Sequence, residues 1–444
     1  MLFSTDKQTL NDLNIFGRHG AESIFYLFNR CVTSGGAALL EELFRHPLSD
    51  DKAINRRAGI IRHFKDAAAG FPFSPGDFGI IDAYLANRDE RSRLSMTHHS
   101  LAGKLGHMLA PEAAVQQVIK GVHALADVLK TCRRFLQSLP PVPDYDTEKE
   151  SMQLLLSEPA LAPILNCKQK LSFEAVAGFD VLLRFRYHDT IKKILKYIYQ
   201  LDVYIAVARV AREREFVLPK ALPRQPLTVS IEGIYHPQVN KAVRNNISIG
   251  SGSNLIFLTG ANMAGKSTFM KSFSIAMYLA HMGFPVAAER MTFSVSDGIY
   301  TTINLPDNLG IGASHFYAEV LRVKKMAQEL AAGKNLFIVF DELFRGTNVK
   351  DACEATIAIV EGFARHRNSV FVVSTHIIEA GAILKRTCDN VKFIYLPTKM
   401  NGAIPVYTYT IEEGITNDRH GMVIVNNEGI LNILEEGIQQ MKLS

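Results

Sequence analysis

The sequence has few of the features that mark secreted or membrane proteins. Only five of its 444 residues are cysteine, and no two stand in a C-x-x-C spacing. Neither a zinc site nor a disulfide framework is therefore predicted. The first ten residues, MLFSTDKQTL, contain no long apolar stretch typical of a secretory signal. A membrane-spanning helix needs a run of about eighteen apolar residues, and no such run appears in the sequence. These absences predict a cytoplasmic protein with no membrane partner.

The composition is that of an ordinary globular chain. Hydrophobic residues make up 47% and charged residues 21% of the sequence, which allows a sizeable core. The length favours two or three domains. The net charge of +5 permits contact with nucleic acid, but a solvated basic surface explains the same value.

The first 225 residues predict a helical domain. Ala37–Phe44 and Val115–Leu139 have helical periodicity, and each stretch is followed by proline. Apolar residues also recur at helical spacing from Phe173 to Phe216. This stretch predicts either one very long helix or two helices broken near Gly178 or His188.

A basic side accompanies the apolar side of this long stretch. It comprises Arg184, Arg186, Lys192, Lys193 and Lys196. The pattern is compatible with a solvated helix face and with a surface that faces DNA.

The segment Pro219–Pro226 marks a domain boundary, and residues 226–444 predict an α/β domain. Apolar runs suited to buried strands alternate there with helical stretches, which predicts a mainly parallel sheet with helices on both faces. The predicted strands are Leu227–Ile231, Leu255–Thr259, Leu336–Phe340, Val370–Ser374, Val391–Leu396 and Val406–Ile411.

The central motif of this domain is a phosphate-binding loop. It fits G-x-x-x-x-G-K-[ST] and lies between a predicted strand and a predicted helix, as such a loop requires. Its backbone N–H groups and the helix N-terminus would bind the phosphates of a nucleotide. Lys266 would reach the β- and γ-phosphates, and the Ser267 hydroxyl would hold Mg²⁺. The residues expected to contact the nucleotide are Gly260, Ala261, Asn262, Met263, Ala264, Gly265, Lys266, Ser267 and Thr268.

Two further strands end in polar residues suited to nucleotide hydrolysis. Leu336–Phe340 is followed by Asp341, which would hold Mg²⁺, and by Glu342, which would orient or deprotonate the attacking water. Val370–Ser374 is followed by Thr375 and His376. The imidazole of His376 could sense the γ-phosphate through a hydrogen bond.

These motifs together resemble those of the MutS family of DNA mismatch-repair ATPases. TGANMAGKST resembles that family's phosphate-binding loop, and DELFRGTN followed by Asp351 resembles its DE-x-x-RGT-x-x-x-D stretch. The segment from Asp307 to Glu319 resembles the family's signature segment, and Arg419-His420-Gly421 stands where the family has Ser-Tyr-Gly. More weakly, Cys31–Arg57 resembles the start of the family's helical core domain.

The resemblance implies a homodimeric ATPase that uses ATP and Mg²⁺ at composite sites. Each site would combine Lys266, Ser267, Asp341, Glu342 and His376 with Ser314 of the partner subunit. The long helices would serve as levers, and helices at the C-terminus would support dimerisation. DNA binding and a role in DNA repair are implied by the family alone.

The sequence also departs from the family pattern. It leaves no room for the mismatch-reading and connector domains, and the core segment looks too short for the DNA clamp. Ala242 or Val243 stands where the family has a Phe that stacks on adenine, and Tyr409 stands where it has a His. The signature reads Ser-His-Phe in place of Ser-Thr-Phe.

Two function classes therefore remain open. The first is an ATPase that binds DNA through its helical arms. The second is an ATP-driven dimerisation switch that binds protein partners and does not recognise mismatches directly. A generic ABC-type ATPase is disfavoured, because the Asp-Glu pair is followed by RGT and the signature is not LSGGQ.

Overall fold

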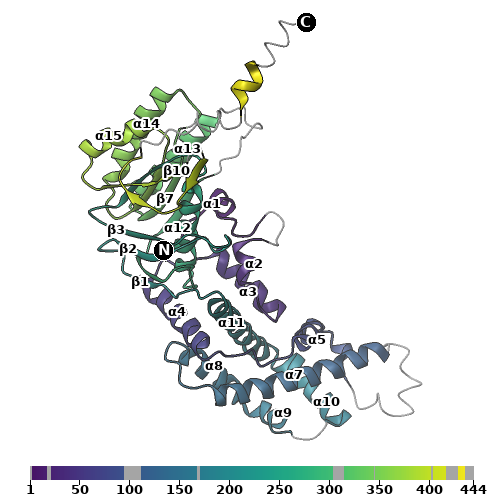
Figure 1. The fold of residues 1–444 in the computed structure, drawn as a ribbon. Coiled ribbons are helices and arrows are strands. Elements are labelled where there is room, and N and C mark those ends of the chain that lie inside the picture. The colour runs from purple at the N-terminus through teal and green to yellow at the C-terminus, as the bar shows by residue number, and fades with distance from the viewer. Residues whose placement is uncertain are drawn as a thin grey trace, which may run out of the picture. The chain divides into compact units, whose positions relative to one another are not determined.

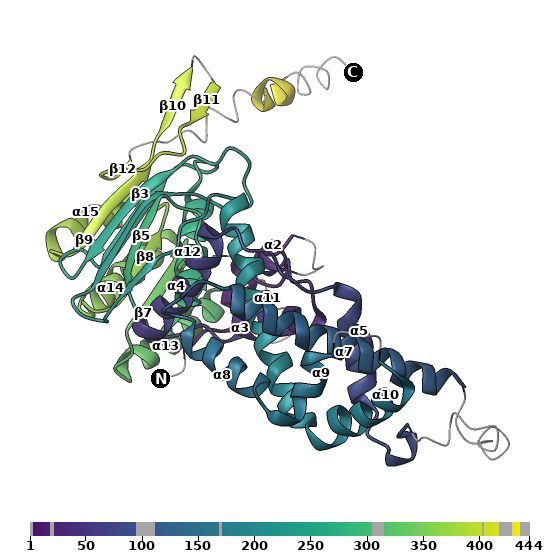
Figure 2. The same cartoon turned by 90° about the horizontal axis from the view of Figure 1, so that it is seen from below.

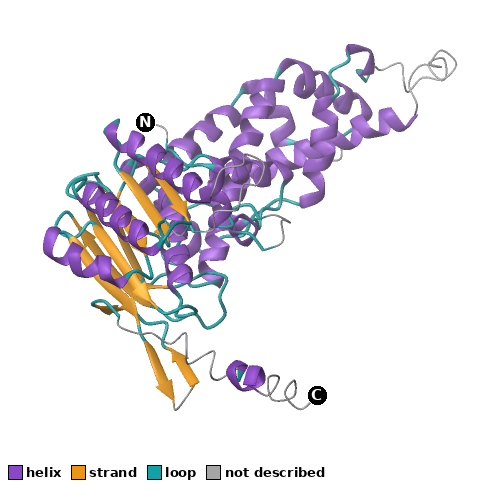
Figure 3. Cartoon of the chain, turned by 90° about the horizontal axis from the view of Figure 1, so that it is seen from above, coloured by secondary structure: helices purple, strands orange, loops and turns teal. Residues whose placement is uncertain are grey.

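The computed structural model describes residues 3–17, 22–94, 112–167, 171–303, 315–344, 346–401, 404–416 and 429–435. The chain forms two compact units. Unit 1 comprises Met1–Tyr26, His46–Ala58 and Arg214–Ser444, and unit 2 comprises Leu27–Arg45 and Gly59–Glu213. This division is discontinuous in the sequence, whereas the proline-rich segment 219–226 predicts a single boundary at residue 225. Strands occur only in unit 1 among the described residues (Figure 3).

All secondary-structure elements of unit 2 among its described residues are helices. The chain enters it within α2 (Ile24–Phe28), leaves it after α3 (Ser34–Arg45) and re-enters it within α4 (Asp51–Asp66). The other α-helices are α5 (Pro75–Ala86), α7 (Glu112–Ser138), α8 (Asp146–Leu156), α9 (Ala162–Asn166), α10 (Phe173–Asp180) and α11 (His188–Glu213). Short 3-10 turns span η1 (Glu90–Ser92) and η3 (Pro159–Leu161). The predicted helices at 37–44 and 115–139 are confirmed as α3 and α7.

The long stretch after Phe173 is broken at one of its two predicted positions. A six-residue π-helix, η4 (Val181–Arg186), follows α10, and α11 then begins at His188. Gly178 lies within α10 and does not interrupt it.

Arg184 does not belong to the exposed basic side that the sequence predicted. Its side chain has 0% exposure and forms an ion pair of 2.7 Å with Asp180, which is also 0% exposed. The guanidinium donates further to Ser92 Oγ at 2.9 Å and to the carbonyl oxygen of Ser92 at 2.9 Å. Helical periodicity cannot separate a solvated arginine from one paired inside the bundle. Lys192, Lys193 and Lys196 are exposed, as predicted.

Unit 1 contains a six-stranded sheet in the order β12-β9-β4-β8-β7-β6. Its strands are β4 (Leu255–Gly260), β6 (Gly298–Thr302), β7 (Leu336–Asp341), β8 (Val370–Ser374), β9 (Val391–Leu396) and β12 (Glu412–Glu413). All neighbouring pairs are parallel except β12 and β9. The predicted mainly parallel sheet is therefore confirmed. At its edge, Ser4 forms a parallel bridge with Gly298 of β6, and helix α1 (Lys7–Asp12) follows.

Helices cover both faces of this sheet (Figure 1). Leu336, Ile338 and Phe340 of β7 pack in one hydrophobic core with residues of α13 (His315–Ala331), α14 (Val349–Ala364) and α15 (Ile378–Thr387). Successive side chains of a strand point to opposite faces, so Phe337 points the other way. Its ring lies 4.8 Å from that of Phe273 in α12 (Lys266–His281). The sheet is thus enclosed, as its continuous apolar strands require.

A second sheet of unit 1 was not predicted. It has the order β1-β5-β2-β3, with β1 (Lys220–Leu222), β2 (Thr228–Ile234), β3 (Asn245–Gly250) and β5 (Arg290–Ser294), and β2 is antiparallel to both its neighbours. The hairpin of β10 (Thr398–Asn401) and β11 (Ile404–Tyr407) extends beyond β9 (Figure 2). The predicted strand 406–411 is wrong beyond Tyr407, because Tyr409 adopts a φ of +56° that ends the extended conformation.

Candidate nucleotide site

The phosphate-binding motif forms the connection between β4 and α12. Two glycines adopt backbone conformations that L-residues rarely adopt, with φ of +148° at Gly260 and +102° at Gly265. A Cβ on Gly260 would lie 3.2 Å from the carbonyl oxygen of Leu396. The loop from Ala261 to Ala264 therefore turns tightly into the N-terminus of a 16-residue helix. Free N–H groups and the helix dipole make such a terminus attractive to phosphate.

Lys266 begins α12 and is directed back towards the loop. Its side-chain nitrogen donates to the carbonyl oxygens of Gly260 at 2.9 Å and Ala261 at 3.1 Å. The residue is 6% exposed. Burial lowers the pKa of Lys266, although the carboxylates of Asp341 and Glu342 act in the opposite direction. The lysine is thus held beside the two acidic residues of the second motif.

Ser267 and Asp341 are joined by a hydrogen bond. The Ser267 hydroxyl lies 2.6 Å from Asp341 Oδ2, so the two predicted metal ligands meet although they come from different elements. Burial raises the pKa of Asp341, and the hydrogen bond from Ser267 opposes this rise.

The second carboxylate oxygen of Asp341 also fits a cation site. Asp341 Oδ1 is buried, and no described residue donates a hydrogen bond of normal length and angle to it. The Ser374 hydroxyl is nevertheless near enough to lower the pKa of the carboxyl. Mg²⁺ prefers oxygen ligands and retains several waters, so it commonly needs few protein ligands. The Ser267 hydroxyl and the Asp341 carboxylate, of which only Oδ2 accepts a hydrogen bond of normal geometry, meet that requirement.

Glu342 and His376 form the second contact of the site. His376 Nε2 lies 2.6 Å from Glu342 Oε1. The N–H of Glu342 donates to the carbonyl oxygen of Ser374 at 2.9 Å, and Glu342 adopts a φ of +53°. Such a conformation costs a non-glycine residue about 1–2 kcal/mol. The strained turn therefore fixes the carboxylate at the carboxyl end of β7, beside the end of β8.

A pocket of about 360 Å³ adjoins the phosphate-binding loop. Tyr409 lines it together with Gly265, Thr268 and both Ala242 and Val243, the positions where the sequence lacks the family's Phe. Tyr409 is 46% exposed, and a Cβ on Gly265 would lie 3.0 Å from its ring. The volume is within the usual range for small-ligand pockets.

Sequence reasoning missed several residues around this pocket. Asn245 donates from Nδ2 to the carbonyl oxygen of Tyr409 at 3.0 Å and accepts from the N–H of Ile411 at 2.8 Å, which fixes the backbone beside Tyr409. His236 also lines the pocket, and burial, followed by the charge of Lys271, lowers its pKa. Neither residue belongs to a motif identified in the sequence.

Two segments quoted for the resemblance meet in the structure. Phe316 of α13 lies 5.7 Å from Phe344 between ring centroids. A Cβ on Gly346 would lie 2.7 Å from the backbone nitrogen of Phe316, so only glycine fits there. Asp307 to Ser314, Arg345 and Arg419 to Gly421, which are also quoted for the resemblance, lie outside the described residues.

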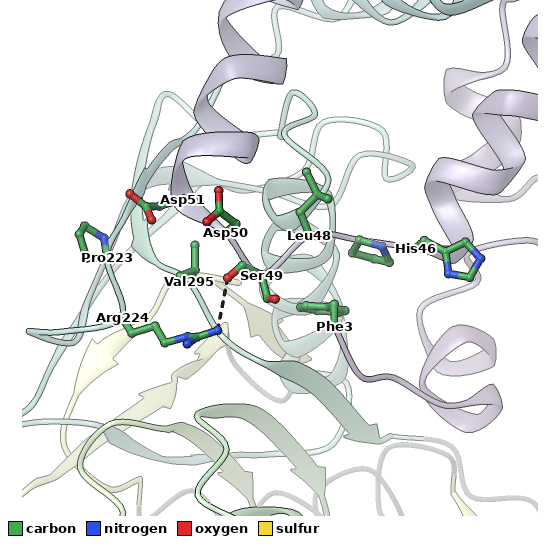
Figure 4. A pocket seen from close by; sticks show the side chains of 10 residues that line it. Phe3, His46, Leu48, Ser49, Asp50, Asp51, Pro223, Arg224 and Val295 are labelled. Atoms are coloured by element: carbon green, nitrogen blue, oxygen red, sulfur yellow. Dashed lines mark hydrogen bonds between the residues drawn. The ribbon is translucent and has the colours of Figure 1, made fainter. Parts of the chain in front are cut away.

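A larger pocket of unit 1, about 620 Å³, contains none of the predicted site residues. Arg224 points across it towards the backbone of Ser49 (Figure 4), donating at 3.4 Å. Its guanidinium also pairs with Asp297 at 2.6 Å. The phosphate-binding loop, and not the larger hollow, gathers the candidate catalytic groups.

Comparisons with known proteins agree with these observations. Residues 8–208 match the family model of MutS domain III, and residues 256–442 match that of MutS domain V. No helix among the described residues is long and apolar enough to cross a membrane.

Individual relatives are proteins named DNA mismatch repair protein MutS. The chain is 31% identical to the one from Geobacillus thermodenitrificans over 253 residues, which cover 55% of this chain and 27% of the relative. It is 28% identical to the one from Geobacillus kaustophilus over 309 residues, which cover 66% and 34%. The match thus spans about a third or less of these relatives' length. Together, two domain models of one family account for most of the sequence, and the chain belongs to the MutS family.

Proposed function

We propose that this chain is an ATP-dependent, DNA-binding ATPase that acts in DNA repair as a homodimer. The observation that carries the proposal is the hydrogen bond of 2.6 Å between Ser267 and Asp341. It brings the phosphate-binding loop and the acidic strand end together, with Lys266 on one side and the Glu342–His376 pair on the other. This arrangement supports phosphoryl transfer, which depends on positioning and on charge stabilisation.

Each residue has a role in hydrolysis that follows from its position. The loop N–H groups and Lys266 would bind the phosphates. Ser267 and Asp341 would hold Mg²⁺, which offsets phosphate charge when bound. A Glu342 carboxylate oxygen would accept a proton from water as the water oxygen bonds to the γ-phosphorus and the bond to the β–γ bridging oxygen breaks. His376 is hydrogen-bonded to Glu342 and would keep that carboxylate in its orientation. Its imidazole would form a hydrogen bond with the γ-phosphate once ATP is bound.

The adenine base would occupy the pocket beside Gly265. Tyr409 would stack on one face of the base, where aromatic contact contributes favourable energy. Ala242 and Val243 offer an apolar but non-aromatic wall in place of a second ring.

The dimer and DNA binding are supported by the family and by charge. We propose that Ser314 of the partner subunit completes each site, so that ATP favours the closed dimer by contacts available only there. The exposed lysines Lys192, Lys193 and Lys196 of α11 provide a basic surface for phosphates of DNA. The relatives are named as mismatch repair proteins. The three lysines of α11 would contact DNA phosphates, which are the same in matched and mismatched DNA.

The test is ATP turnover measured without DNA and with duplex, mismatched and branched DNA, alongside binding at increasing salt. Stimulation by DNA and a steep fall of affinity with salt are expected. Turnover without any DNA binding at low salt would favour the alternative function, an ATP-driven switch that binds protein partners. Absence of ATP turnover under all conditions would refute the ATPase itself.

A further inference from the structure

We infer that a groove between α8 and α11 is a docking site for an acidic, amphipathic helix of a partner protein. Both helices belong to unit 2, whereas the nucleotide site is built from residues of unit 1. Docking of a partner protein here goes beyond the proposed function and does not require ATP turnover.

The groove is an open hollow of about 480 Å³. The helices α8 and α11, labelled in Figure 1, lie against each other, and one face of each lines the hollow. Residues of α11 three and four positions apart share a helix face, and this face extends about 10 Å from Lys193 to Gln200. That length matches about two turns of a bound helix. The lining residues are Ser151, Leu154 and Leu155 of α8 and Lys193, Lys196, Tyr197 and Gln200 of α11.

The groove contains an apolar surface. Leu154 is 74% exposed, and Leu155 beside it is partly buried. Tyr197 contributes an aromatic ring from α11 and is also partly buried. A single exposed leucine is ordinary, but apolar side chains grouped in a hollow with a polar rim are typical of a surface that binds another protein.

The charged side chains of the groove are both positive. Lys193 and Lys196 are exposed, and neither forms an ion pair with a residue that the structure describes. The acidic residues of α8, which are Asp146, Glu148 and Glu150, do not line the groove. Two cations beside leucines therefore favour a ligand that carries carboxylates next to apolar side chains.

The groove also offers polar groups suited to a peptide. Gln200 Oε1 is buried and receives no hydrogen bond from a described residue, which costs free energy. A peptide carries N–H donors that the Gln200 amide could turn to meet, whereas the phosphates of DNA carry acceptors only.

An acidic helix fits these features better than nucleic acid or a lipid surface does. DNA phosphates would pair with the lysines but would gain nothing from Leu154 and Leu155. A bilayer is flat and cannot enter a hollow between two helices. A helix with apolar residues at i, i+3, i+4 and i+7 would cover the leucines, and its flanking carboxylates would meet the lysines. Lys193 and Lys196 also belong to the proposed DNA surface, so a docked partner would withhold them from DNA.

The test measures the binding of a fluorescent synthetic peptide to the full chain by anisotropy. The probe has about fifteen residues of leucine, alanine and glutamate, with leucine at positions i, i+3, i+4 and i+7 of a helix. The wild-type protein should bind it at low salt, and the affinity should fall as the salt concentration rises. Peptides with lysine in place of glutamate, or with alanine in place of leucine, should bind ~10-fold more weakly or worse.

Variants of the protein locate the bound peptide. Leu154→Gln should weaken binding ~10-fold, because a leucine side chain is no longer buried on binding. Gln153→Ala, at the neighbouring exposed position outside the groove, is its control and should bind as the wild type does. Lys193→Ala/Lys196→Ala should also lose ~10-fold in affinity at low salt, whereas Lys192→Ala, outside the groove, should lose less than about twofold. All these side chains are exposed, so the variants should fold.

Absence of peptide binding to the wild type, or wild-type affinity in Leu154→Gln, would overturn the inference. A labelled DNA duplex and phosphatidylserine vesicles, measured on the same proteins, identify what the groove binds instead. If the duplex binds through Lys193 and Lys196 and the peptide does not bind, the docking role is wrong and the proposed function stands. Binding of the vesicles without binding of the peptide would likewise overturn the docking role. If neither peptide nor duplex binds, the docking role and the proposed DNA binding are both refuted.

Discussion

His376 Nε2 lies 2.6 Å from Glu342 Oε1, so a single hydrogen bond joins the residues that follow β7 and β8. The pair places a carboxylate beside Lys266, at the phosphate-binding loop. That carboxylate is the candidate acceptor for the proton of the attacking water, and its partner fixes its orientation.

Glu342→Gln should preserve ATP binding and slow hydrolysis by ~100-fold or more, because the amide cannot accept the proton. ATP should then persist on the protein and prolong the closed dimer. Single-turnover hydrolysis and size measurements with ATP would show both effects. Hydrolysis at the wild-type rate would refute the assigned role.

Lys266→Ala should abolish ATP turnover, because it removes the buried cation beside the loop. The exposed Lys385 of α15 provides the control, and Lys385→Ala should turn over ATP normally. Steady-state phosphate release measures both variants. An equal loss of ATP turnover in Lys266→Ala and Lys385→Ala would contradict a specific role of Lys266.

Tyr409→Ala should weaken ATP binding ~10-fold, since stacking on a base contributes about 1–3 kcal/mol. Tyr409→Phe retains the ring and should bind ATP almost as wild type. The Kd for a non-hydrolysable ATP analogue is the measurement. An unchanged Kd in Tyr409→Ala would place the base elsewhere.

His281 should make unit 1 less stable in mild acid. Its ring is completely buried; Nε2 accepts from the Ser296 N–H at 2.9 Å, so Nδ1 must donate to the Met277 carbonyl oxygen at 2.7 Å. Burial lowers the pKa of His281 from 6.5 to about 4.

Protonation therefore favours the unfolded state between these two pH values, and about 3 kcal/mol of unfolding free energy should be lost as the pH falls from 6.5 to 4. Denaturant unfolding of the wild type and of His281→Gln across this range would isolate the contribution. Parallel pH profiles for the two proteins would contradict it.

Arg184→Ala should destabilise unit 2 by about 3–5 kcal/mol, because it leaves the buried Asp180 carboxylate without its partner. Lys193→Ala, at an exposed position of α11, should change stability by about 0.5 kcal/mol or less. Thermal unfolding would distinguish them. Similar small effects would show that Arg184 is solvated after all.

The parts of the site that were predictable are those in which neighbours in sequence fix the local conformation. Gly260, Gly265, Lys266 and Ser267 lie within one turn-and-helix segment, so their spacing carries the geometry. Asp341 and His376 each follow a continuous apolar run, and parallel strands bring such ends to the same edge of a sheet. The break before His188 was one of two predicted positions, and the structure selects it.

Contacts between distant segments had no such local signal. Asn245 reaches the backbone of Tyr409 across 164 positions, and Asp12 reaches Thr301 across 289. The role of Arg184 depends on Ser92 and Asp180, which periodicity cannot reveal. The sheet β1-β5-β2-β3 joins strands whose pairing is largely antiparallel, whereas alternation of strands and helices indicates only parallel neighbours.

The bridge between Ser4 and β6 has a consequence for the order of events during biosynthesis. Ser4 and its hydrogen-bond partner Asp297 are separated by 293 positions, and all of unit 2 is translated between them. All residues of unit 2 are synthesised before Asp297 leaves the ribosome. Domains generally fold as units during synthesis. We therefore expect Ser4 and its neighbours to remain undocked until β6 has been synthesised, and their attachment to follow the folding of unit 2.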